Sequence, residues 1–108
     1  MEMRESRGGD SLLLELEGKF DIEEAMRFEN RLNTLLPERI RTIALDLEKL
    51  TYIDSSAIGS IIKIMNLVRN YDGDLILLGV SPHIRNIFAL ARLDAFFDIR
   101  DKESFILS

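Results

Sequence analysis

The first part of the chain alternates apolar and polar positions with the period of a β-strand. Residues 11–17 place three leucines on one face and two glutamates on the other, which predicts a strand with one buried face. A turn sequence, Gly8-Gly9-Asp10, comes before it, so we expect residues 3–7 to form a short antiparallel partner strand. The leucines expected on the buried face are Leu12, Leu14 and Leu16.

From Asp21 onward the apolar spacing changes to the three- and four-residue steps of a helix. Asp21 and Glu24 resemble a capping box, so we expect a helix from Asp21 to about Leu36, closed by Pro37. Residues 40–47 then resume the alternation of a strand and predict a central strand of the sheet. The buried stripe of the helix is expected at Ala25, Phe28, Leu32, Leu35 and Leu36.

A second helix is expected after the segment Asp54-Ser55-Ser56. The three side chains offer oxygens that can cap a helix, and the apolar residues beyond them recur with helical spacing to about Tyr71. A continuous apolar run at residues 75–80 is typical of a strand covered on both faces. Strand, helix and strand in this order imply a parallel, right-handed crossover.

The last third of the chain predicts one more helix and a short strand. Ser81 and Pro82 are a favourable helix opening, and we expect that helix to reach about Arg92. A short strand over residues 96–100 and a terminal helix should follow, with Asp101 suited to the positive end of the helix dipole. The elements together predict an α/β fold: a single domain over residues 1–108, with a mixed sheet of four to five strands and helices mainly on one face.

Composition narrows the possible functions. The chain has 14 Lys and Arg against 19 Asp and Glu, and this net charge of -5 disfavours a nucleic acid partner. The absence of cysteine and the single histidine exclude thiolate sites and imidazole clusters, so no metal or cofactor is expected. The uncharged stretches are shorter than the ~20 apolar residues of a membrane span. The N-terminal charges disfavour a secretion signal, so we expect a cytoplasmic protein with no membrane insertion.

The most promising chemistry lies in residues 52–60, YIDSSAIGS, between a buried strand and a helix start. The crevice beyond the carboxyl ends of parallel strands is the usual functional face of such sheets. Free N–H groups at a helix start favour an anion, so a phosphate on Ser55 would be tolerated. Ser55 is alternatively a helix cap, a task that Asp54 or Ser56 could equally perform. The chain contains no GxxxxGK[ST], GxGxxG or GxSxG motif that would indicate nucleotide binding or a hydrolase.

The chain resembles the STAS domains of bacterial anti-sigma factor antagonists, in which an Asp-Ser-Ser or Asp-Ser-Thr turn joins a strand to a helix. Besides that turn, the resemblance rests on GKFD at residues 18–21, ALDLEKLTYID at 44–54 and GVSPHIRNIF at 79–88, in the order found in the family. Two positions depart from the family pattern. Lys19 stands where an acidic residue is common, and Ala57 replaces a usual glycine, adding a methyl group beside the acceptor serine.

The resemblance implies a binding switch rather than an enzyme. The unphosphorylated protein would bind an anti-sigma factor, itself a serine protein kinase, and free the sigma factor. Phosphorylation of Ser55 would reverse this, and a PP2C-type phosphatase would restore the binding form. By the same resemblance, the partner-binding residues are Asp21, Asp54, Ser55, Ser56, Ala57, Ile58 and Gly59.

Several roles remain open at this point. Asp54 caps the second helix or orients the acceptor hydroxyl, and Asp21 caps the first helix, contacts the partner, or does both. Gly59 permits either the close approach of a partner backbone or tight packing against the sheet. The alternative function is that of a STAS-type interaction subunit in a stress-signalling scaffold or transport complex, not gated by phosphorylation of Ser55.

Overall fold

The computed structural model describes residues 1–105, which form one five-stranded sheet and three α-helices. The strands are β1 (Glu2–Gly8), β2 (Ser11–Phe20), β3 (Thr42–Ile53), β4 (Asp74–Leu78) and β5 (Asp98–Arg100). The helices are α1 (Ile22–Leu35), α2 (Ser55–Arg69) and α3 (Pro82–Leu90), with 3-10 turns at Leu36–Glu38 and Lys102–Ser104. Within residues 1–105, no helix has the length and apolar character needed to cross a bilayer.

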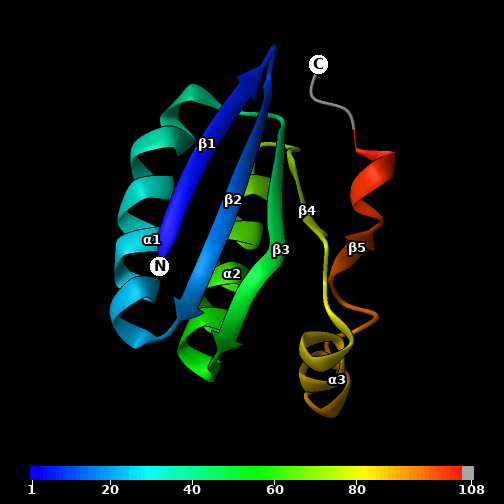
Figure 1. Ribbon diagram of the computed structural model, residues 1–108. Coiled ribbons are helices and arrows are strands. Elements are labelled where there is room, and N and C mark those ends of the chain that lie inside the picture. Colours follow the sequence, from blue (N-terminus) through cyan, green and yellow to red (C-terminus); the bar gives the residue numbers. More distant parts are fainter. Residues whose placement is uncertain (106–108) are drawn as a thin grey trace.

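The sheet is mixed, as the sequence predicts. Its strands lie in the order β1-β2-β3-β4-β5, with β1 antiparallel to β2 and the other neighbours parallel. In Figure 1, α1 and α2 lie side by side behind the sheet, and α3 lies near the end of β4. The prediction of an α/β fold with helices mainly on one face is therefore confirmed.

The main core lies between the sheet and the helices. All three leucines expected on the buried face of β2 are buried there, together with four of the five stripe positions of α1; the fifth, Leu36, lies just past the helix and is only partly buried. Phe20 of β2 and Phe28 of α1 meet edge to face, with ring centroids 5.2 Å apart, which anchors the first helix to the sheet. Ile84 and Phe88 bring α3 into the same core. Met65 of α2 is buried there as well.

The other face of the sheet carries a second, smaller apolar cluster. Ala44, Ile76 and Leu78 are buried there, with Leu13 and Phe105 packed against them. Residues 75–78 are therefore buried on both faces of the sheet, as their continuous apolar run predicts.

Sequence-based boundaries were wrong at three elements. The last strand begins at Asp98 and not at residue 96, because Phe96 and Phe97 lie in the turn before it. The central strand continues past Leu47 to Ile53, because Leu50, Tyr52 and Ile53 keep pairing with the end of β2. The terminal helix is only a 3-10 turn at Lys102–Ser104, and residues 106–108, which that prediction also covered, lie outside the described residues. A short helix gains little from its own hydrogen bonds, and here long-range contacts hold the segment instead. Lys102 reaches Asp46 at 2.8 Å, and Phe105 packs on the second cluster.

At position 79, directly after β4, both the backbone conformation and the lack of room for a Cβ require glycine. Its φ is +63°, and a Cβ there would lie 2.8 Å from the Glu48 Cβ and 2.9 Å from an Asp46 carboxylate oxygen. Gly79→Ala is therefore expected to lower the free energy of unfolding by about 1–3 kcal/mol, because left-handed strain and a steric clash add together. Urea denaturation monitored by circular dichroism measures this loss. An unchanged midpoint would contradict the crowding seen at this position.

Candidate functional site

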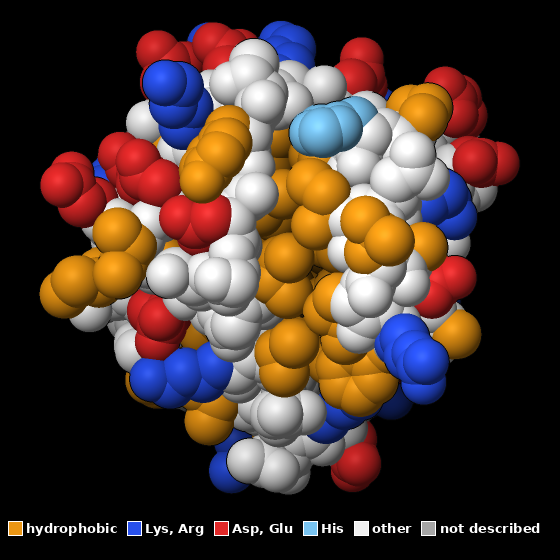
Figure 2. Space-filling view, turned by 90° about the horizontal axis from the view of Figure 1, so that it is seen from below, with side chains coloured by type: hydrophobic (Ala, Val, Ile, Leu, Met, Phe, Trp, Pro, Cys, Tyr) orange, Lys and Arg blue, Asp and Glu red, His pale blue; other side chains and the backbone are white. Residues whose placement is uncertain are grey.

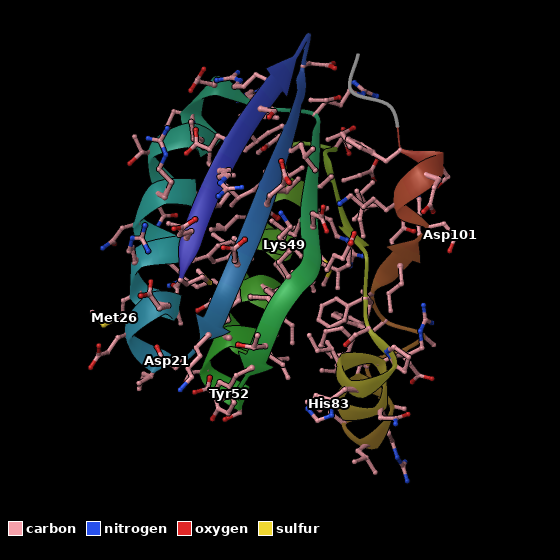
Figure 3. The ribbon with its side chains drawn as sticks, viewed as in Figure 1. Asp21, Met26, Lys49, Tyr52, His83 and Asp101 are labelled. Atoms are coloured by element: carbon pink, nitrogen blue, oxygen red, sulfur yellow. The ribbon has the colours of Figure 1, made fainter. Side chains whose placement is uncertain are left out.

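The candidate site lies where β2 and β3 end and lead directly into α1 and α2. These two strands are parallel, and Phe20 pairs with Ile53, so the residues that follow, Asp21 and Asp54, emerge at the same edge of the sheet. The Asp54 backbone N–H donates to the Phe20 carbonyl at 3.3 Å, which joins the two strand ends. Figure 3 shows Asp21 and Tyr52 at this end of the molecule.

Both helices are capped by the aspartate that precedes them. Asp21 Oδ1 accepts a hydrogen bond from the Glu24 N–H at 3.2 Å, and Asp54 Oδ1 accepts one from the Ala57 N–H at 3.0 Å. These bonds confirm the capping roles expected of both aspartates. The predicted capping box is only half formed, because the Glu24 side chain turns to Arg27, whose hydrogen bond lowers the pKa of Glu24.

Ser55 is the first residue of α2, and its side chain is exposed. Within the described part of the chain, its hydroxyl makes no hydrogen bond to another protein group, because Asp54 already supplies the cap. Ser56, next to it, is half-buried. Of the two roles considered for Ser55, capping therefore falls to Asp54, which leaves the Ser55 hydroxyl free at the surface.

The next residues of α2 divide between core and surface. Ala57 is 0% exposed and Ile58 is 8% exposed, so both side chains belong mainly to the core. The Ala57 methyl therefore does not stand on the surface beside Ser55, which corrects that expectation. Gly59 is exposed, and a Cβ added there would have no neighbour within 4 Å, so the explanation of Gly59 by tight packing was wrong.

Because the space around Gly59 is open, Gly59→Ala is expected to stabilise the isolated protein. Alanine is favoured over glycine in a helix interior by up to about 1 kcal/mol, and nothing here opposes the added methyl group. The midpoint of thermal unfolding, measured by calorimetry, should rise. Gly79→Ala is the matched control, since the same chemical change is expected to be destabilising at that position. A lower midpoint for Gly59→Ala would contradict its place on the open face of α2.

A polar contact between the two helices was missed from the sequence. Ser60, which is buried, donates a hydrogen bond to Glu29 Oε2 at 2.5 Å, and Lys63 Nζ lies 2.8 Å from Glu29 Oε1. The hydrogen bonds from Lys63 and Ser60 lower the pKa of Glu29. The stability that this contact contributes is present above the unfolded pKa of the carboxyl group and is lost as the pH falls through the lowered folded value. The contact links α1 to α2 and so helps to hold Asp21 and Ser55 in a constant relative position.

Other chemistry at this end is limited. His83 is exposed on the first turn of α3 (Figure 3), and it forms no hydrogen bond with Ser55. In the part of the chain that the structure describes, no three histidine, aspartate or glutamate side chains gather as a possible metal site. The site therefore consists of a surface hydroxyl, two capping carboxylates and the exposed backbone of a helix start.

Comparison with known proteins identifies the family. The STAS domain profile matches residues 1–105, and the chain belongs to this family. A STAS-domain containing protein of Pseudomonas aeruginosa is 27% identical over 96 residues, covering 87% of this chain and 92% of that protein. The anti-sigma-B factor antagonist of Staphylococcus aureus is 25% identical over 84 residues, covering 78% of each chain.

Solved structures support the fold assignment. The anti-sigma factor antagonist SpoIIAA in its unphosphorylated form matches with a TM-score of 0.83 and 22% identity, covering 95% of this chain and 91% of that one. The phosphorylated form of SpoIIAA, described as a Bacillus cell fate determinant, matches with a TM-score of 0.75 and 22% identity, covering 95% of each chain. The architecture around Ser55 is thus that of an established STAS fold.

Proposed function

We propose that this chain is an anti-sigma factor antagonist, a binding module that acts in the cytoplasm. Its unphosphorylated form binds an anti-sigma factor and thereby releases the sigma factor, without catalysing a reaction itself. Membership of the STAS family and relatives named as anti-sigma factor antagonists support this proposal. The single observation that carries it is the exposed Ser55 hydroxyl at the start of α2, relieved of any capping task by Asp54.

The proposed switch is the phosphorylation of Ser55. A phosphate adds about -1.5 to -2 charges and a bulky hydrated group at neutral pH. The start of α2 tolerates this charge within the protein, because the helix dipole is positive there. A partner surface that fits a neutral hydroxyl would instead face desolvation and steric costs. The switch therefore acts at the interface, and the fold itself keeps its arrangement.

The proposed partners follow from this switch. The anti-sigma factor serves as the serine protein kinase that modifies Ser55, and a PP2C-type phosphatase returns the protein to its binding form. The contact surface combines the side chains of Asp21, Asp54, Ser55 and Ser56 with the exposed Gly59. Ala57 and Ile58 contribute mainly through their backbone, because their side chains face the core.

A pull-down with native and Ser55→Asp protein tests the proposal. The bait is added to lysate of the source organism, and bound proteins and modified serines are identified by mass spectrometry. We expect an anti-sigma factor kinase to be recovered with the native bait and to be strongly depleted with Ser55→Asp. Equal recovery of the same partners by both baits would contradict a switch at Ser55 and would favour an ungated STAS interaction subunit.

A further inference from the structure

Three large apolar side chains on the segments next to the Ser55 turn are exposed. Ile22 and Met26 lie one turn apart on α1, with 62% and 65% of their surface exposed. Tyr52, near the end of β3, is 46% exposed. Within residues 1–105, the large hydrophobic residues with comparable exposure are these three together with Leu90 and Phe96.

The three side chains belong to the segments that frame the site. Ile22 directly follows Asp21, and Tyr52 stands two residues before Asp54. Tyr52 pairs across the sheet with Lys19, two residues before Asp21, so the strand ends bring Tyr52 towards the start of α1. Figure 3 shows Met26, Asp21 and Tyr52 at the same end of the molecule.

The fold does not explain this exposure. The helix already buries a complete apolar stripe through Ala25, Phe28 and Leu32, and Ile22 and Met26 lie outside it. By contrast, the exposed Phe96 has partners within the fold, since its ring packs against Phe97 and lies 5.7 Å below the Arg69 guanidinium. Single exposed hydrophobic residues are ordinary, whereas a group of them rimmed by polar residues marks an interaction surface.

The charges on the segment ends that carry these side chains are mainly acidic, although the exposed Lys19 lies beside Tyr52 on the neighbouring strand. Asp21, Glu23 and Asp54 stand on the same two segment ends, and none of the three forms an ion pair with another described residue. Figure 2, which views the molecule from this end, shows exposed hydrophobic side chains with both acidic and basic side chains around them. A complementary partner surface would therefore be apolar at its centre and would carry Lys or Arg at its rim.

We propose that Ile22, Met26 and Tyr52 are the apolar anchors of the docking surface, and that their occupant is an apolar patch with a basic rim on the anti-sigma factor. This inference rests on the proposed function and adds a division of roles to it. The anchors supply affinity because their apolar surface is removed from water on binding. The carboxylates speed the association, and phosphorylation of Ser55 prevents it. Interfaces commonly concentrate their binding energy in a few side chains of this kind.

Isothermal titration calorimetry with the purified anti-sigma factor from the pull-down tests the anchors. Ile22→Ser and Met26→Ser are each expected to raise Kd by about tenfold, and Met26→Leu, which keeps the apolar area, should restore most of the affinity. Leu90→Ser is the matched control, because Leu90 is an equally apolar residue on α3 with 87% exposure, and its Kd should stay native. All four variants should keep the native unfolding midpoint, because the replaced side chains contribute little to the core.

Salt dependence separates the anchors from the carboxylates. The variant Met26→Ser should weaken binding by the same factor at low and high ionic strength, whereas Glu23→Gln should reduce the salt dependence of association. If Ile22→Ser and Met26→Ser bind with native Kd while Ser55→Asp still weakens the complex, the assignment of these residues as anchors is wrong and the proposed function stands. An equal loss of affinity for Leu90→Ser would also contradict the assignment of the anchors. Failure of the native protein to bind any anti-sigma factor would overturn both proposals.

Discussion

Phosphorylation of Ser55 is expected to raise the Kd for the anti-sigma factor by about 100-fold or more. The phosphate would place about two negative charges and a bulky hydrated group where the proposed partner surface fits a neutral hydroxyl, so binding would carry desolvation and steric costs. The affinity of phosphorylated and unphosphorylated protein for the purified partner, measured by calorimetry, gives the ratio directly. Ser55→Asp should show a smaller effect, because aspartate carries a single charge and a smaller group.

Ser56→Ala is the matched control for this experiment. It removes the half-buried Ser56 hydroxyl from the proposed contact surface, and it should leave the phosphorylation of Ser55 and the ratio between the two Kd values intact. Amide chemical shifts should change around the start of α2 after phosphorylation, while those of the sheet stay the same. Similar Kd values for the two forms, or shift changes throughout β2 and β3, would contradict a switch confined to the surface.

The second large effect is expected for stability. Phe28→Ala should lower the free energy of unfolding by about 3–5 kcal/mol, because Phe28 is fully buried and its removal leaves a cavity against Phe20. That is a large fraction of the about 5–15 kcal/mol that stabilises a typical domain. Urea unfolding followed by circular dichroism measures the loss. Because α1 is capped by Asp21 and carries Ile22 and Met26, the variant should also lose affinity for the partner near its unfolding midpoint.

Met26→Ala is the control for this prediction, since Met26 lies on the same helix but is largely exposed. Its free energy of unfolding should stay within about 0.5 kcal/mol of the native value. Comparable losses for Phe28→Ala and Met26→Ala would contradict the assignment of these residues to opposite faces of α1. A small loss for both would show that α1 is not anchored through Phe28.

Local patterns predicted most of the fold and the core of the site. The alternation in residues 11–17 and the helical spacing after Asp21 reflect burial on one face, which each segment shows on its own. Asp21, Asp54 and Ser81 were recognised as caps for the same reason, since a cap bonds to an N–H only a few residues away. The exposure of Ser55 likewise follows from its place at the start of a helix.

Features that depend on distant residues were missed. A hydroxyl at position 60, within the apolar stripe of α2, was the only sign of a polar partner, and nothing in the sequence indicated that the partner is Glu29. The C-terminal segment has the composition of a helix start, but Lys102 binds Asp46 across the sheet and overrides that preference. Gly59 was open to two interpretations, because helical spacing alone does not tell a tight contact from open space.

The cap provided by Asp54 has a consequence for how such a protein can diverge. Since the Asp54 carboxylate caps α2, the neighbouring Ser55 hydroxyl is not needed for the stability of the native state. A lineage that stopped using a kinase could replace Ser55 at little thermodynamic cost, whereas loss of Asp54 would weaken the whole helix. The regulatory residue Ser55 and the structural residue Asp54 are thus neighbours in the sequence but can evolve separately.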